Sequence, residues 1–148
     1  MTGCGAWNEV RGEFWSRKFP RFMQSAEYPI HQKEFLTVIV EVKVWGPGWS
    51  GKRVAIHCDN ASVVETISHL KPKDLEMQRL LREFLYHVTT YKFEPVLIRI
   101  PTKSNCLADF VSRNHRVQDI QKEFAKFGVK NMVPIEVPED MFGFIADW

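Results

Sequence analysis

The stretch from Arg53 to Asn60 constrains the fold of this chain more than any other part. It reads Arg-Val-Ala-Ile-His-Cys-Asp-Asn, a run rich in β-branched and apolar residues that ends in an acid. A helix-forming run, residues 61–68, follows directly. This order predicts a buried strand whose carboxyl end presents Asp59, and ligands in α/β sheets bind at such ends. Asp59 could instead cap the following helix, and the stretch alone favours both interpretations equally.

The remaining sequence alternates predicted strands and helices, which indicates an α/β fold in one main domain. Glycines that alternate with Cys4 open the chain and are typical of a strand that another backbone approaches closely. We predict strands at residues 1–7, 12–16, 21–24, 53–58 and 94–100. We predict helices at residues 30–45, 61–68, 106–113 and 117–127, and one that begins at Asp74 and ends near Tyr91.

The helix predicted at residues 30–45 carries an acid at the edge of its apolar stripe. The stripe consists of residues spaced three and four apart, namely Phe35, Val38, Val42 and Trp45. Glu34 lies one turn before Val38, so we expect its carboxylate to point toward the sheet. The alternative is that Glu34 is a solvated helix acid.

Asp109 is a third acid at a comparable position. It lies in the first turn of the helix predicted at residues 106–113, where the helix dipole favours an ionised carboxylate. If Glu34, Asp59 and Asp109 converge, they repel one another unless a cation neutralises them. Mg²⁺ and Mn²⁺ prefer such oxygen ligands, and two ions ~4 Å apart can activate a water for phosphodiester hydrolysis. Asp109 could also simply pair with Arg113, one helical turn later.

Four short motifs follow one another along residues 2–113. They are Thr2-Gly-Cys-Gly-Ala6, Ile30-His-Gln-Lys-Glu34-Phe-Leu36, Ile56-His-Cys-Asp59-Asn60 and Ile100-Pro-Thr-Lys-Ser-Asn105-Cys-Leu-Ala-Asp109-Phe-Val-Ser-Arg113. Together they resemble the ribonuclease H-like domain of retrotransposon reverse transcriptases, with the DIRS/Ngaro-like and gypsy-like groups most similar. The last motif looks like the "IPG…N…AD.LSR" signature of these elements.

The resemblance implies a fold and an activity. It implies a mixed five-stranded sheet with helices on both faces for residues 1–113, followed by a C-terminal helix and extended tail at residues 114–148. It also implies cleavage of the RNA strand of RNA–DNA hybrids, with Mg²⁺ or Mn²⁺ held by the catalytic ligands Glu34, Asp59 and Asp109.

One family position has no counterpart in this sequence. The family's first strand begins with an aspartate, upstream of the glycines, that usually bridges both metals. We expect that position to precede Met1. The first strand would then be truncated, and the cation would be weakly bound or lost. The alternative function is therefore a non-catalytic remnant of a reverse transcriptase polyprotein that binds nucleic acid or a protein partner.

Charge and cysteine usage limit the partners and the compartment. A net charge of +2 over 148 residues permits a nucleic-acid partner without requiring one. Candidate nucleic-acid contacts are Lys71, Lys73, Arg79, Lys103 and Asn105. The basic residues could equally form a solvated surface, and Asn105 a helix cap. The three cysteines have neither zinc nor disulfide spacing, so we expect an intracellular protein, cytoplasmic or nuclear. No run is apolar and long enough to predict a membrane span.

Overall fold

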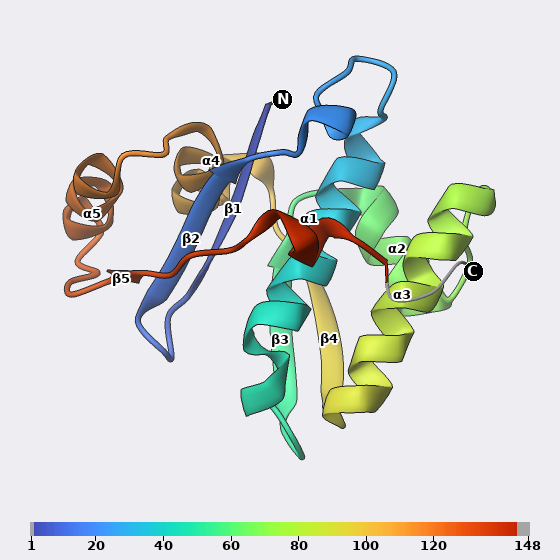
Figure 1. Cartoon of the computed structure of the whole chain (residues 1–148). Coiled ribbons are helices and arrows are strands. Elements are labelled where there is room, and N and C mark those ends of the chain that lie inside the picture. The colour runs from blue at the N-terminus through green and yellow to red at the C-terminus, as the bar shows by residue number, and fades with distance from the viewer. Residues whose placement is uncertain (1, 145–148) are drawn as a thin grey trace.

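Strands and helices alternate along the chain in the computed structural model, which describes residues 2–144 and confirms the α/β class (Figure 1). Strands β1 (Gly3–Asn8) and β2 (Glu13–Lys18) form an antiparallel hairpin. Gly12 ends its turn with a φ of +64°, a left-handed conformation that glycine adopts without strain. The third strand of this sheet is β5 (Val133–Pro134), which pairs with β2 in parallel.

The strand predicted at residues 21–24 was wrong. Residues Arg21–Met23 form a 3-10 helix instead, in which the amide of Met23 donates to the carbonyl of Pro20 over 2.9 Å. Only Met23 is buried there, and Phe22 is 62% exposed, so the segment lacks the buried face that a strand in this sheet requires.

Strands β3 (Arg53–Cys58) and β4 (Glu94–Arg99) pair in parallel as a separate two-stranded sheet. Among the strands of residues 2–144, β1 pairs only with β2, and β3 only with β4. The expected single five-stranded sheet is therefore not formed. A cleft lies between the beginning of β1 and the carboxyl end of β3. Residues of both strands line this cleft, and no ladder hydrogen bond joins β1 to β3 within residues 2–144.

Helix α1 (Ile30–Trp45) runs through the centre of the molecule. The predicted stripe of Phe35, Val38, Val42 and Trp45 is buried, and Leu36, Ile39 and Val40 are buried as well. The helix is apolar around most of its circumference because other elements cover it on several sides: β1, α2 (Ala61–His69) and α3 (Leu75–Tyr91). Asp74 caps α3 by accepting the amide of Met77, as its predicted start requires.

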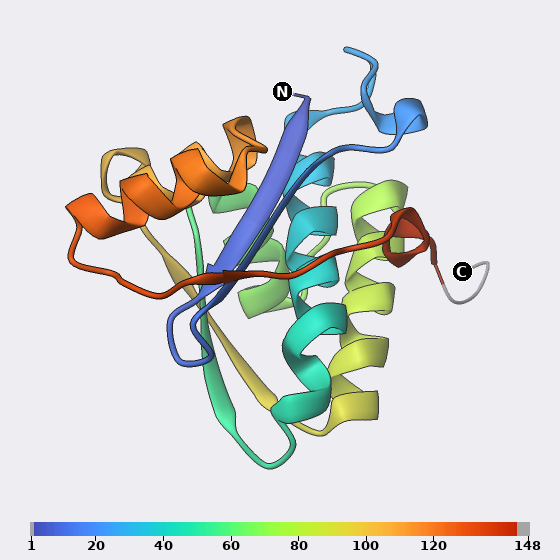
Figure 2. The ribbon, with the colours of Figure 1, turned by 60° about the vertical axis from the view of Figure 1, so that its left-hand side comes forward.

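Helices α4 (Cys106–Arg113) and α5 (Val117–Lys126) lie on the other side of the hairpin from α1 (Figure 2). They form a second, smaller core with the hairpin and the segment before β5, made of Phe14, Val111, Ile120, Phe124 and Met132. The three-stranded sheet is thus covered by helices on both faces, as expected.

The chain after α5 crosses the molecule and enters the main core. Beyond β5, Val137 and Phe142 are buried in that core, and Arg17 donates to the carbonyl of Val137 over 2.8 Å. Residues on both sides of the boundary predicted after Arg113 therefore share the same packed interior. None of the helices formed by residues 2–144 is long and apolar enough to cross a membrane.

Candidate metal centre

A cleft of about 760 Å³ opens where the amino-terminal ends of β1 and α1 meet the carboxyl end of β3 and helix α4. Its polar lining includes all three predicted acids, Glu34, Asp59 and Asp109. Asn60 and Arg113 also contribute. The cleft thus brings together residues that are far apart in the sequence, among them Glu34 and Asp109, which are 75 positions apart.

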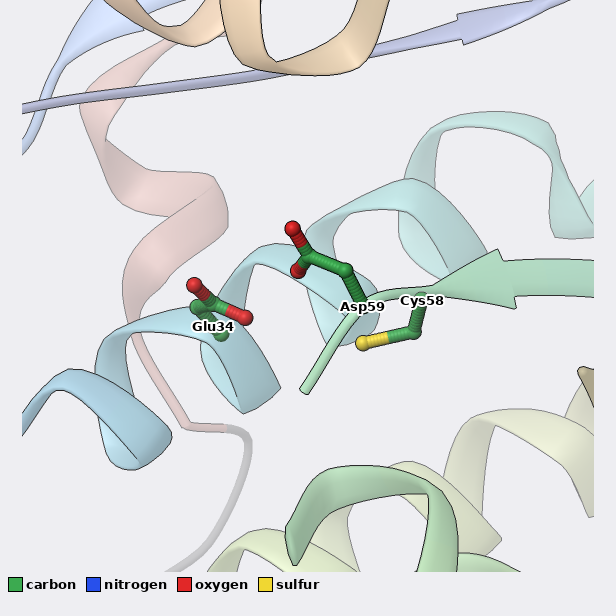
Figure 3. Close-up of side chains that lie close together, drawn as sticks. All are labelled: Glu34, Cys58 and Asp59. Atoms are coloured by element: carbon green, nitrogen blue, oxygen red, sulfur yellow. The ribbon is translucent and has the colours of Figure 1, made fainter. Parts of the chain in front are cut away.

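Glu34 and Asp59 approach each other closely, and Cys58 joins them (Figure 3). A carboxylate oxygen of each acid and the Cys58 sulfur all lie within 4.8 Å of one another. Helix α1 supplies Glu34, and the end of β3 supplies the other two. The capping interpretation of Asp59 was wrong, because Asn60 caps α2 by accepting the amide of Val63 over 3.2 Å. Asp59 is left to face the cleft.

The electrostatics of Glu34 reflect this crowding. Its pKa is raised to about 7, first by burial and then by the negative charge of Asp59 and a hydrogen bond with that carboxyl group. The charge of Asp109 raises the pKa of Glu34 further, while a hydrogen bond from Asn60 lowers it. Near neutral pH, the Glu34 carboxyl group therefore carries a proton in part of the molecules. A bound cation would take the place of that proton.

Asp109 lies at the rim of the same cleft but outside the 4.8 Å group. Its Oδ1 accepts a hydrogen bond from Nε of Arg113 over 3.0 Å, and its side chain is 45% exposed. The predicted pairing with Arg113 is therefore confirmed. Because its charge still influences Glu34, Asp109 is electrostatically part of the site.

Two residues of the site were not singled out in the sequence. Glu41 lines the cleft seven positions after Glu34, where the helix repeat returns to the same face. Burial raises the pKa of the Glu41 carboxyl group to about 8, so this group is mostly protonated at neutral pH. Cys58 is buried, and burial raises the pKa of its thiol to about 12. The i+7 spacing could have identified Glu41, whereas only the alternation of β3 marks Cys58 as inward-facing.

The predicted nucleic-acid contacts are spread over the surface. Among the described lining residues of the cleft, Asn105 is the one member of that set. Asn105 occupies the N-cap position of α4, as predicted. Its side chain makes no capping hydrogen bond, so the prediction that this side chain caps the helix was wrong. Lys73 donates to the Ser62 hydroxyl over 2.8 Å. Arg79 lies 4.1 Å from the centre of the Phe144 ring. Lys71 is exposed on a loop, and Lys103 is exposed in the 3-10 helix Thr102–Ser104.

The donor set limits what this arrangement can do chemically. Carboxylate oxygens suit Mg²⁺ and Mn²⁺, and a cation between Glu34 and Asp59 would relieve their repulsion. The protonated thiol of Cys58 is a poor ligand for such hard ions. The acids, not the thiol, are therefore the residues that could hold a metal. The sequence matches no protein-family model, and no curated protein and no solved structure resembles it closely enough to identify a relative.

Proposed function

We propose that this domain is a retroelement-derived, ribonuclease H-like nuclease that cleaves the RNA strand of RNA–DNA hybrids with Mg²⁺ or Mn²⁺. The observation that supports it best is the approach of Glu34 and Asp59 from two different elements to within 4.8 Å in an open cleft. Acids are rarely held this close without a proton or cation between them. In this proposal Glu34 and Asp59 hold the cation, and Asp109 completes the site from the rim.

In this proposal the residues of the site have different roles. A bound divalent cation would lower the pKa of a coordinated water and stabilise the leaving oxygen of the phosphodiester. Glu34 must lose its proton to act as a ligand, and its raised pKa makes this step dependent on pH near 7. Asn60, which hydrogen-bonds Glu34 and caps α2, keeps that carboxyl group oriented toward Asp59.

A second function, binding of nucleic acid or a protein partner without cleavage, is favoured by one specific observation. Arg113 already neutralises Asp109, which lies outside the group formed by Glu34, Asp59 and Cys58. With two close carboxylates, a cation would be held less firmly than with three. Hybrid binding would then persist without cleavage.

The deciding experiment measures cleavage of labelled RNA–DNA hybrid by residues 1–148 in Mg²⁺ and in Mn²⁺. We expect slow cleavage, which Asp59→Asn lowers by about two orders of magnitude because metal stabilisation supplies several kcal/mol. Asp119→Asn on α5 is the matched control and leaves the rate unchanged, because Asp119 is on the surface and pairs with Arg116. Cleavage that Asp59→Asn leaves unaffected would place the active site elsewhere.

An added strand extends this test. The edges of β1 and β3 on the two sides of the cleft are unpaired within residues 2–144. Fusing a strand that starts Asp-Ala-Ser ahead of Thr2 would supply a further carboxylate near Asp59. We expect this fusion to accelerate cleavage and Asp59→Asn to abolish the gain. The second function would be supported instead if neither the unextended chain nor the fusion cleaves the hybrid, while both bind it with a steep dependence on salt.

A further inference from the structure

Arg113 is the basic residue of α4 whose guanidinium lies at the rim of the candidate metal centre. It donates through Nε to Oδ1 of Asp109 over 3.0 Å, and its side chain is 75% exposed. The two terminal amino groups of the guanidinium have no hydrogen-bond partner among the described residues. A guanidinium has five N–H donors in a planar fork, so most of its donors remain available to a ligand in the cleft.

The contact with Asp109 has an electrostatic consequence for the whole cleft. The charge of Asp109 reaches Glu34 and raises its pKa. In the absence of a metal, Arg113 is the cation that neutralises Asp109. A divalent cation bound between Glu34, Asp59 and Asp109 would compete with Arg113 for the same carboxylate, and its own charge would repel the guanidinium.

We propose that Arg113 is a positioning residue that exchanges partners: it holds Asp109 in the metal-free cleft and binds a phosphate of the nucleic-acid strand once a divalent cation occupies Asp109. This inference rests on the proposed function. Planar guanidinium groups bind phosphate oxygens in the same forked geometry as carboxylate oxygens, so one side chain can serve both partners. Cation binding and strand binding are then coupled, and each strengthens the other by the same factor.

The first test measures Mn²⁺ affinity in the absence of nucleic acid, by electron paramagnetic resonance of the free ion. Arg113→Gln removes the competing cation and is expected to tighten Mn²⁺ binding by up to about fivefold, the range of an exposed ion pair. A merely structural role would weaken binding instead. Arg116→Gln is the matched control, because Arg116 also pairs with an aspartate, Asp119, at 3.9 Å but lies outside the cleft lining. It should leave Mn²⁺ affinity unchanged.

The second test measures binding of a labelled RNA–DNA hybrid at several salt concentrations, with Ca²⁺ or with a chelator. The unsubstituted chain should bind the hybrid more tightly with Ca²⁺, and Arg113→Gln should lose this gain. Its salt slope in Ca²⁺ should fall by roughly 0.7 to 0.9, the value of one lost phosphate contact. Arg113→Lys keeps the charge without the fork and should retain part of the gain.

The outcomes separate this inference from the proposed function. If Asp59→Asn abolishes Mn²⁺ binding but Arg113→Gln and Arg116→Gln behave alike in both tests, the exchange by Arg113 is overturned and the metal centre stands. If Mn²⁺ binding is insensitive to Asp59→Asn, the metal centre and the exchange both fail. A circular dichroism spectrum and melting temperature equal to those of the unsubstituted chain confirm that each variant is folded.

Discussion

Nζ of Lys43 lies 3.7 Å from Oε1 of Glu83, and both side chains are less than a tenth exposed. The same Glu83 oxygen is 3.0 Å from Nε2 of His87. Lys43 also donates to the carbonyls of Met141 and Gly143, so it ties α1 to both α3 and the C-terminal segment. This buried ion pair joins three parts of the chain at a single point.

Removing Lys43 should therefore destabilise the fold strongly. We expect Lys43→Met to lower the free energy of unfolding by about 3 to 5 kcal/mol, because it removes one partner of a buried ion pair. Arg53→Met is the matched control: Arg53 pairs with Glu94 at the same 3.7 Å, but both side chains are more than half exposed. It should cost less than about 1 kcal/mol. Urea denaturation of both variants provides the measurement, and equal losses would contradict the role of burial.

Cation affinity should depend on pH through the titration of Glu34. Its pKa of about 7 in the metal-free protein means that a cation must displace a proton below that pH. We expect the apparent Mn²⁺ affinity to rise from pH 6 to pH 8 and to level off above. Isothermal titration calorimetry in buffers of different ionisation enthalpy would count the protons released. An affinity that is flat over this range would show that Glu34 is not a ligand.

Glu41 should make the protein less stable at high pH. Its pKa is raised from 4.5 to about 8 by burial, so the folded state disfavours the charged form. The unfolded chain loses its proton near pH 4.5, and stability therefore falls as pH rises from there to about 8. We expect Glu41→Gln to be nearly neutral at pH 4 and stabilising by roughly 1 to 3 kcal/mol at pH 9. Urea denaturation at both pH values checks this, and a stabilisation that does not change with pH would contradict it.

The glycines of β1 set the position of α4 and hence of Asp109. A Cβ at Gly5 would lie 2.6 Å from the carbonyl oxygen of Trp15 and 2.6 Å from Cγ1 of Val111. We expect Gly5→Ala to displace α4, to destabilise the fold by about 1 to 3 kcal/mol and to weaken Mn²⁺ binding. In the control Gly48→Ala, the new Cβ meets only the flexible end of Arg11, at 3.2 Å. Thermal melts and Mn²⁺ titrations of both variants would compare them, and similar behaviour would argue against tight helix–strand packing as the cause.

The helices could be predicted from the sequence because their signals are local. The apolar stripe of α1, the Asp74 cap of α3 and the glycine after α5 each act within a few residues. The parallel pairing of β5 with β2 has no such signal. β5 contributes only two residues to this pairing, Val133 and Pro134. Their position beside β2 depends on the direction in which the chain leaves the preceding helix. The division into two sheets likewise depends on tertiary packing. The local sequence of a strand is the same whether or not its outer edge pairs with another strand.

The candidate site was predictable in part for the same reason. Asp59 is marked by the end of a strand and Glu34 by the edge of a helical stripe, and the fold brings them within 4.8 Å. The contact between Arg113 and Asp109 follows from an i+4 spacing that the sequence already contains. The i+7 spacing places Glu41 on the same face of α1 as Glu34, but spacing alone does not distinguish a cleft residue from a solvated helix acid.

The pairing of β5 with β2 also bears on how the protein folds. Arg17 and Val137, which hydrogen-bond beside these strands, are 120 residues apart in the chain. Such non-local contacts close large loops and form slowly. During synthesis, Phe14 and Phe19 of the hairpin segment become fully covered only after residues 132–142 have been made, because Met132 and Phe142 complete the two cores that bury them. Until then the nascent domain exposes aromatic surface and an open strand edge, the features that chaperones recognise and that promote aggregation.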